Sequence, residues 1–282
     1  MEDKVTIKRI LRLLAISAKM DLVWLLRDTK YAVIGICGDL FNNLATVSGI
    51  FLIATRFGGI GGMNVDEVLF MMAYSTMITG IFTTFGSGNN IHISRIIGRG
   101  QLEHLFIQPL PLGVQLSTCG FTPFTSSGNI VVGIVMLVVS VTRLRIEISF
   151  IWIAGLAAHL AVTMVIIIAR SYLVSSMAFY APVAAEEIST TAIEGTWLLS
   201  TFPLSGMPLS LQIPLLTILP EGLMAWFPAL CLLGKPPLNF SAYYPLFYAI
   251  AISLAAGVIF RKGMKYYVQK GSNRYVPYGF RR

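Results

Sequence analysis

The chain has 282 residues, of which 55% are hydrophobic and only 12% charged, whereas a soluble domain of ordinary composition carries about 25% charged residues. Its formal net charge of +8 does not point to nucleic acid, because 14 of the 21 basic residues lie in segments 1–30 and 261–282 and flank apolar runs. Uncharged runs long enough to cross a hydrocarbon core of roughly 30 Å recur, so the composition excludes a soluble domain and indicates a multi-pass membrane protein.

Residues 1–30 carry the pattern of a helix that lies in the membrane surface. Apolar side chains recur at spacings of three and four residues from Ile7 to Leu25, and basic side chains from Lys4 to Lys19 fall largely on the other side. Such a two-sided helix binds lipid with its apolar face and leaves its charges in water. We therefore expect a cytoplasmic amphipathic interface helix here; a soluble helix packed on a partner is the alternative.

Residues 31–260 form the expected transmembrane domain of an all-α membrane protein. The apolar runs predict spans at about 31–55, 68–86, 113–142, 148–178, 208–220 and 242–260. Between the fourth and fifth spans, residues 183–207 bring in Glu186, Glu187 and Glu194. We expect a short helix and a loop outside the apolar core there.

Polar residues inside the first span form a candidate site. Asp39, Asn42 and Asn43 have the spacing i, i+3 and i+4, which places them on one face of a helix. A carboxylate in lipid costs about 2.5–3.5 kcal/mol, so this face must meet water or a partner. It either lines a translocation path or pairs with a partner subunit, or it forms a hydrogen-bonded cluster that only holds helices together. Glu221 leaves the same alternatives open.

A short polar segment follows the second span, "IIGRGQLEHLFIQPLPLGVQ" at 96–115. Its apolar residues Leu102, Leu105 and Phe106 are spaced to face a bundle. Its polar residues are left for water or a partner protein, and they are Arg99, Gln101, Glu103 and His104. Pro109 and Pro111 end the helix. We expect a rigid, two-faced helix on the cytoplasmic surface; an ordinary surface loop is the alternative.

Prolines interrupt the apolar segment "PLSLQIPLLTILPEGLMAWFPALCLLGKPP" at 208–237. Each interior proline removes a backbone hydrogen bond and kinks the preceding turn, so a single straight helix is excluded. Broken helices at membrane depth are tolerated only against protein or a wet cavity. We expect a span at 208–220 and a re-entrant segment at 221–235, with its turn at Pro220, Phe227 and Pro228.

The distribution of basic residues predicts the topology. Six spans place both termini on one side, and 17 of the 21 lysines and arginines fall on that side if it is the cytoplasm. Residues 261–282 then form a basic cytoplasmic tail. No G-x-x-x-x-G-K-[ST] motif is present, so the chain is not expected to hydrolyse ATP. The three histidines have no carboxylate or cysteine at ligand spacing, and we expect no metal, no cofactor and no enzymatic activity.

Three segments resemble the ABC-2-type permeases of ATP-binding cassette transporters, in particular the branch of six-span subunits with roughly 260–280 residues. The first is "IIGRGQLEHLFIQPLPLGVQ", similar to the family's Gly-x-Leu-Asp/Glu-x-Leu-Leu-x-x-Pro-Leu-Pro segment after span two. The second is "FPLSGMPLSLQIPLLTILPEGLMAWFPALCLLGK", similar to span five with its proline-rich return. The third is the basic tail "RKGMKYYVQKGSNRY". With the order of spans, the resemblance covers about residue 30 to the C-terminus.

The resemblance implies a permease subunit that pairs with a second permease, identical or related, above two cytoplasmic ATPase subunits that bind ATP and magnesium. The segment 98–106 would be the coupling helix, and its residues toward the ATPase would be Gly98, Arg99, Gln101, Leu102, Glu103, His104, Leu105 and Phe106. Segment 1–30 would be the connecting helix, and export from a bacterial cell is the direction the family favours. A membrane scaffold or channel-like subunit that transports nothing by ATP is the alternative function.

Overall fold

The computed structural model describes residues 7–85, 87–98, 100–118, 120–236 and 242–271. Within these ranges the regular secondary structure is helical, apart from an isolated β-bridge between Ile60 and Met63. The predicted all-α fold class is confirmed. The elements are α1 (Ile7–Arg27), α2 (Thr29–Phe57), α3 (Val65–Phe85), α4 (Ser87–Gly98), α5 (Leu102–Phe106), α6 (Leu112–Thr118), α7 (Gly128–Leu144), α8 (Phe150–Ser175), η1 (Ser176–Phe179), α9 (Pro182–Ser200), η2 (Leu204–Gly206), α10 (Leu209–Thr217), η3 (Pro220–Leu223), α11 (Trp226–Leu232) and α12 (Tyr244–Lys270).

Local sequence signals explain where several of these helices begin and end. Asn64 and Glu67 form a capping box at the start of α3, in which each side chain accepts the other residue's backbone N–H at 2.8 and 3.1 Å. The hydroxyl of Ser149 caps α8 by accepting the N–H of Trp152. α9 begins at Pro182, whose missing N–H costs nothing in the first turn. α2 ends at Gly58, which adopts the left-handed conformation with φ +72°.

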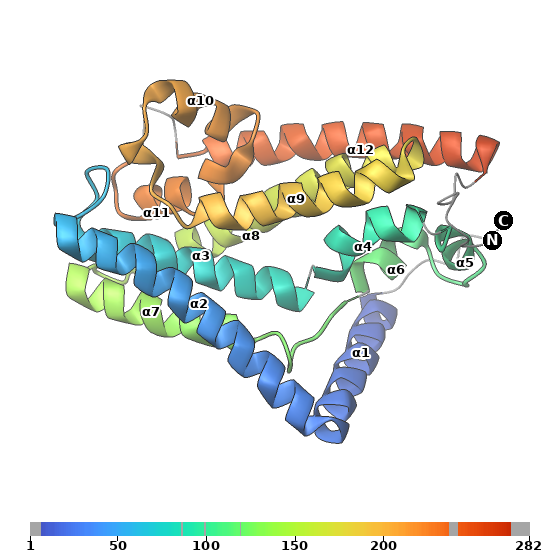
Figure 1. Cartoon of the computed structure of the whole chain (residues 1–282), viewed down its shortest axis with the longest axis horizontal. Coiled ribbons are helices and arrows are strands. Elements are labelled where there is room, and N and C mark those ends of the chain that lie inside the picture. Colours follow the sequence, from blue (N-terminus) through green and yellow to red (C-terminus); the bar gives the residue numbers. More distant parts are fainter. Residues whose placement is uncertain (1–6, 86, 99, 119, 237–241, 272–282) are drawn as a thin grey trace.

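The long helices α3, α8, α9 and α12 run roughly parallel or antiparallel to one another, and most of the connections lie toward two opposite ends of the bundle (Figure 1). α4, α5 and α6 lie at one end, and α10 and α11 lie at the other; we call these the α5 end and the α10 end. α8 and α9 are antiparallel, because only Tyr180 and Ala181 separate η1 from α9 while Arg170 contacts Thr196 further along. α9 therefore returns from the α5 end to the α10 end.

Two apolar cores hold the bundle together. The larger core lies between α3, α7, α8 and the α11 region and buries Phe70, Tyr74, Trp226 and Phe227 almost completely. The smaller core lies at the α5 end and joins α4, α5 and α6 to η1, α9 and α12. Its members include Ile97, Leu102, Leu116, Phe179 and Tyr267.

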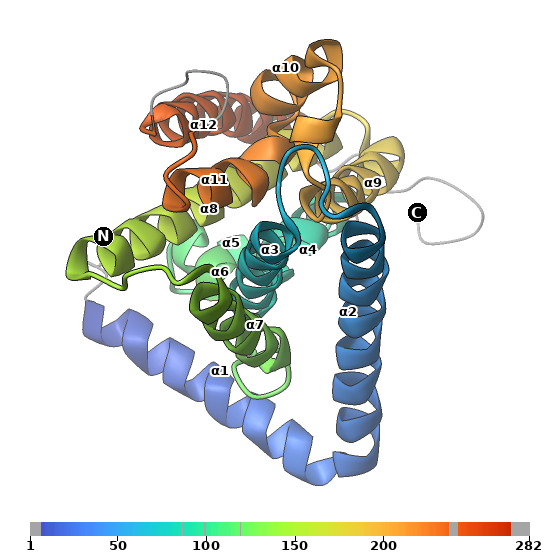
Figure 2. The same ribbon diagram turned by 90° about the vertical axis from the view of Figure 1, so that its left-hand side faces the viewer.

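α1 and α2 lie at the edge of the bundle and meet each other at an angle (Figure 2), and the second half of α2 packs against the larger core through Val47, Ile50 and Ala54. α1 is attached through Asp21, which is 7% exposed. Its carboxylate accepts hydrogen bonds from the backbone N–H groups of Phe124 and Thr125 and from the Thr125 hydroxyl, at 2.8, 3.2 and 2.7 Å. The amphipathic helix expected within 1–30 is therefore tied to the connection before α7.

Four helices in the described part of the chain are long and apolar enough to cross a membrane, namely α2, α3, α8 with η1, and α12. A fifth is added if α10 and the segment from η3 through α11, which meet at 74°, count as one broken span. α7 is apolar but has only 17 residues. The expected spans 31–55, 68–86 and 148–178 coincide closely with α2, α3 and α8–η1.

The helices differ from the other expected segments in three places. Residues 113–142 are divided between α6 and α7 by a turn that contains Gly120 at φ +86° and Pro123. Residues 183–207, expected as a short helix and loop, contain all but the first residue of the 19-residue α9. The expected span 242–260 continues as α12 to Lys270, so the first part of the expected basic tail 261–282 is helical.

The chain after α8 differs from the expected arrangement in the lengths of its helices. Segment 208–220 contains only the nine-residue α10, with Pro214 inside it, and the chain from 201 to 243 leaves and rejoins the bundle at the α10 end (Figure 1). α9 instead runs along α8. Its glutamates made it look too polar, but Glu186 is paired with Arg95 of α4 at 2.7 Å. A hydropathy average over α9 treats Glu186 as an unpaired charge, because its partner Arg95 lies 91 residues away in the sequence.

Glycines allow α3 and α7 to pack with their backbones in contact, and this packing gives a testable prediction. A β-carbon at Gly133 would lie 2.6 Å from the backbone nitrogen of Met77, and one at Gly80 would lie 2.4 Å from that of Ile130. We expect Gly133→Val to separate the helices and to lower the free energy of unfolding by about 1–3 kcal/mol or more. The fraction of protein that stays monodisperse after heating in detergent measures this loss.

Gly35→Val is the matched control, because a β-carbon at Gly35 in α2 meets nothing within 4 Å. Both variants place the same β-branched residue inside a helix, so intrinsic helix propensity affects them equally. Equal losses in the two variants would contradict the close packing of α3 on α7.

Candidate functional site

Residues 100–111, which we call the α5 tip, form a tight reversal at the α5 end. α4 ends at Gly98, and Gly100 then adopts φ +66°. The N–H of Gly100 donates to the carbonyl of Ile97 and the N–H of Gln101 to that of Ile96, at 3.1 and 2.9 Å. This pair of bonds closes a helix end and favours glycine, because the left-handed conformation strains any residue with a β-carbon. The reversal starts the five-residue helix α5.

The side chains of the α5 tip follow the expected two-faced pattern with one exception. Leu102 is 2% exposed and Leu105 is half-buried, while Gln101, Glu103 and His104 are exposed. Gly98 is buried at the end of α4, and Arg99 lies outside the described residues. Phe106 was expected to face the bundle, but it is 46% exposed and Ile107 beside it is 81% exposed. The tip therefore presents polar groups together with two large apolar side chains.

Gln115 of α6 holds the α5 tip in this shape. Its buried side-chain amide donates to the carbonyls of Leu105 and Leu110, at 2.9 and 2.6 Å. Arg9 of α1 reaches the carbonyl of Pro109 at 3.4 Å. Because these contacts hold backbone groups before and between the two prolines, the tip is fixed to α6 and touches α1.

The tip is also tied to the bundle through α4. Arg95 pairs with Glu186 of α9 at 2.7 Å, and the hydroxyls of Ser94 and Ser189 are 2.8 Å apart. Leu102 itself lies in the smaller core with residues of η1, α9 and α12. The α5 tip is thus connected to η1, α9 and α12 through the packed side chains of the smaller core and, by way of α4, through an ion pair.

An ion pair lies inside the bundle where η3 reaches α8 and α9. A guanidinium nitrogen of Arg170 lies 2.6 Å from Glu221, and these side chains are 11% and 3% exposed. The Arg170 guanidinium also donates to the hydroxyl of Thr196. The second carboxylate oxygen of Glu221 has no hydrogen-bond partner among the described residues. The arrangement fixes the η3 segment to α8 and α9.

Three of the four residues proposed for the translocation path lie in α2, and the fourth, Glu221, lies in η3. The backbones of Asp39 and Asn43 lie in α2, but their side chains lie outside the described part of the structure. Asn42 is exposed on α2. Glu221 is buried against α8 and paired with Arg170. Its position agrees with the structural alternative, in which the carboxylate pairs within the bundle.

The expected turn residues Pro220, Phe227 and Pro228 are all buried in or beside the larger core. α10 and the segment from η3 through α11 meet at 74°. The prolines are consistent with this break, because Pro220 begins η3 and Pro214 lies inside α10. Segment 209–232 thus folds back within the α10 end, with its aromatic side chains as the anchor.

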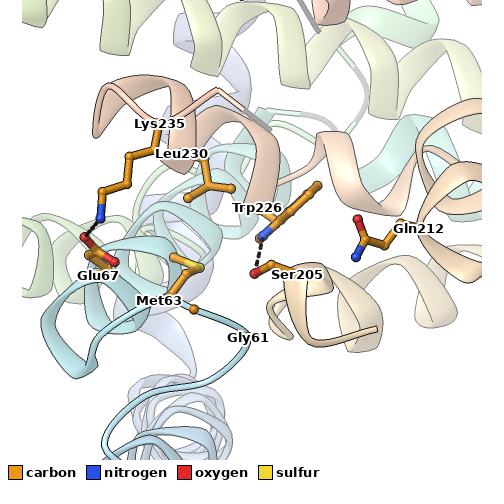
Figure 3. Close-up of a pocket in the computed structure, with 9 residues that line it drawn as sticks. Gly61, Met63, Glu67, Ser205, Gln212, Trp226, Leu230 and Lys235 are labelled. Atoms are coloured by element: carbon orange, nitrogen blue, oxygen red, sulfur yellow. Dashed lines mark hydrogen bonds and ion pairs between the residues drawn. The ribbon is translucent and has the colours of Figure 1, made fainter. Parts of the chain in front are cut away.

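A hollow of about 270 Å³ lies where this segment meets the loop before α3 (Figure 3). The Lys235 ammonium lies 2.5 Å from the Glu67 carboxylate, and the Trp226 indole N–H donates to the Ser205 hydroxyl at 3.3 Å. Both contacts border the hollow in Figure 3, beside Gln212 and Gly61. The backbone of Gly61 approaches that of Gly206 so closely that a β-carbon would lie 2.2 Å from its nitrogen. These contacts tie the α10 end together.

Sequence reasoning missed Asp21, Glu67, Arg170 and Lys235 as structural contacts. The Asn64–Glu67 pair does carry a readable capping signal. Arg170 was counted among the basic residues on the cytoplasmic side, but it is 11% exposed within the bundle. Only the folded chain brings it to Glu221, 51 residues away in the sequence.

Comparisons with known proteins give one match. A family model described as "ABC-2 family transporter protein" matches residues 40–271. No curated protein and no solved structure matches the chain. The match covers α5, α9 and the segment from α10 through α11, and it agrees with the resemblance drawn from the sequence.

Proposed function

Because the chain belongs to the ABC-2 family of transporter proteins and is a permease component of an ATP-binding cassette transporter, we propose that it forms an export path with a second permease. Separate cytoplasmic ATPase subunits, two for each pair of permeases, bind ATP and magnesium and drive the transport. The observation that carries this proposal is the α5 tip, which is exposed at its surface and tied to α4, α6, α9 and α12 beneath.

The proposed topology has six spans, α2, α3, α7, α8, α9 and α12, with the α5 end in the cytoplasm. α9 takes the place that the sequence assigned to 208–220. Two observations support this assignment: α9 is antiparallel to α8, and segment 201–243 begins and ends at the α10 end. The excess of lysine and arginine in segments 1–30 and 261–282 supports cytoplasmic termini.

In the proposed mechanism the α5 tip docks on the ATPase. Binding of ATP draws the two ATPases together because ATP favours their closed state, and only that difference in affinity shifts the permease. The tip passes the movement to α9 through the Arg95–Glu186 pair and to α12 through the smaller core. α1 follows, because Arg9 touches the tip and Asp21 holds the connection to α7.

The second permease is proposed to cover the open side of α2. No residue is buried in the 18-residue apolar stretch that makes α2 a candidate span. In the corresponding stretch of α3, 72% of the residues are buried. Asn42 is exposed on α2. By their spacing, Asp39 and Asn43 lie on the same face of α2 as Asn42. This polar face would line a path between two permeases, while the neighbouring apolar residues of α2 would contact the partner or lipid.

Co-purification tests the proposed function. The chain is expressed together with an ABC ATPase from the same genome, and a tag on the chain is used to recover the complex in mild detergent. We expect the ATPase to be recovered near one-to-one and its hydrolysis to drive transport in proteoliposomes. Vesicles with an ATPase whose catalytic carboxylate is replaced serve as the control. Recovery of the chain without any ATPase, even after cross-linking, would support the scaffold alternative instead.

A further inference from the structure

The surface between α8 and α12 contains a long apolar groove. Two adjoining hollows of about 370 and 410 Å³ share Val165 and Ser253. The floor is formed by small residues, and Ala169 and Ala256 are 7% and 4% exposed. Gly257 lies in the same hollow, and a β-carbon there would meet nothing within 4 Å. The groove is therefore open space beside packed helices.

Basic residues continue the line of the groove along α12. Ser253, Gly257, Arg261 and Lys265 follow one another at intervals of four residues, which places them on one side of the helix. Arg261 lines the hollow nearer the α5 end, and it has no hydrogen bond or ion pair with the described part of the chain. Lys265 is exposed one turn further. The apolar channel thus ends at cationic groups.

The dimensions match one leaflet of a bilayer. From Ser253 to Arg261 the helix advances eight residues, or about 12 Å at 1.5 Å per residue. One leaflet contributes roughly 15 Å of hydrocarbon. An acyl chain that fills the first hollow thus places its headgroup near Arg261, and the second hollow leaves room for a longer chain.

The side of the bundle on which the groove lies favours lipid over another protein. α8 and α12 lie across the bundle from α2 (Figure 2), which is the face proposed for the second permease. Long basic side chains at this depth reach the headgroups while their stems stay in hydrocarbon. Anionic lipids collect around such residues on the cytoplasmic leaflet.

We propose that the α8–α12 groove binds one anionic phospholipid of the inner leaflet, with an acyl chain in the groove and the phosphate at Arg261 and Lys265. The groove accepts the acyl chain because its lining is mostly apolar and the small floor residues Ala169 and Ala256 leave space above them. The two cations select the charge of the headgroup. The site rests on the proposed topology, in which the α5 end lies in the cytoplasm, but it does not depend on transport.

Native mass spectrometry with added phosphatidylglycerol or phosphatidylcholine tests the site on the full chain in mild detergent. We expect the wild type to retain one phosphatidylglycerol, and Gly257→Leu to lose it because the new side chain fills the groove. Ala255→Leu is the matched control, since Ala255 is exposed on α12 and does not line the groove. Equal retention in both variants would overturn the proposal.

A second pair of variants tests the headgroup. Arg261→Gln is expected to reduce the preference for phosphatidylglycerol over phosphatidylcholine about fivefold, the size of effect typical of one basic residue near the membrane surface. Lys262→Gln removes the same charge one position away from the line of the groove and is expected to keep the preference. An unchanged preference in Arg261→Gln would overturn the proposed headgroup contact.

A second copy of the chain is the competing occupant of the groove. In that case Gly257→Leu would shift the distribution between monomer and dimer and leave phosphatidylglycerol retention unchanged. That result would overturn the lipid site without affecting the proposed function, which co-purification of the ATPase tests separately.

Discussion

Ile107→Asp is expected to abolish recovery of the ATPase with this chain while the chain itself stays folded in the membrane. Ile107 is 81% exposed and lies beside the 46% exposed Phe106 at the α5 tip. Large apolar side chains surrounded by polar ones commonly carry most of the energy of an interface. A buried carboxylate there would cost at least about 2 kcal/mol, which weakens binding roughly thirtyfold. The ratio of ATPase to permease after tag purification measures the effect.

Val268→Asp is the control for this experiment. Val268 lies in the last turns of α12 at the same end of the bundle and is 70% exposed, so the change in charge and in exposed apolar surface is similar. We expect it to retain the ATPase. If Ile107→Asp and Val268→Asp bind equally well, the α5 tip is not the docking surface.

Arg170→Met is expected to destabilise the chain more than any surface change, by about 3–5 kcal/mol. The substitution leaves the Glu221 carboxylate, 3% exposed, without its counter-charge. A carboxylate in that position must bind a proton or pull water into the bundle. The monodisperse fraction after a temperature series in detergent should fall at a clearly lower temperature than for the wild type.

Arg143→Met provides the comparison, because it breaks an exposed pair with Asp66 at 3.5 Å, in which the side chains are 55% and 36% exposed. Such pairs contribute at most about 1 kcal/mol. Combining Arg170→Met with Glu221→Leu should restore most of the stability, since apolar residues of similar volume replace a buried pair well. A double variant as unstable as Arg170→Met alone would contradict this account of the pair.

The double variant also separates the two interpretations of Glu221. If the carboxylate only holds η3 against α8 and α9, the double variant folds and transports. If Glu221 contacts the cargo, the double variant folds but does not transport. The same assay with Asp39→Asn tests the polar face of α2, where normal transport would favour a structural role.

Much of the fold was predictable because it depends on signals local in the sequence. Long apolar runs predicted α2, α3 and the α8–η1 segment within a few residues, since the cost of placing polar groups in lipid limits what a span contains. Prolines predicted the break around Pro220. The spacing of Leu102 and Leu105 predicted the buried side of the α5 tip, and the exposed Gln101, Glu103 and His104 followed from the same pattern.

The tertiary structure determined which residues far apart in the sequence pair with one another. α9 packs along α4 and α8, where Glu186 meets Arg95, and Arg170 lies inside the bundle, where Glu221 reaches it. Lys235 is held at Glu67, and Asp21 at the turn before α7. In each case a charge that looks too costly for its place becomes acceptable once a partner far along the chain satisfies it. Hydropathy is a property of single segments, so only the folded arrangement of helices reveals these partners.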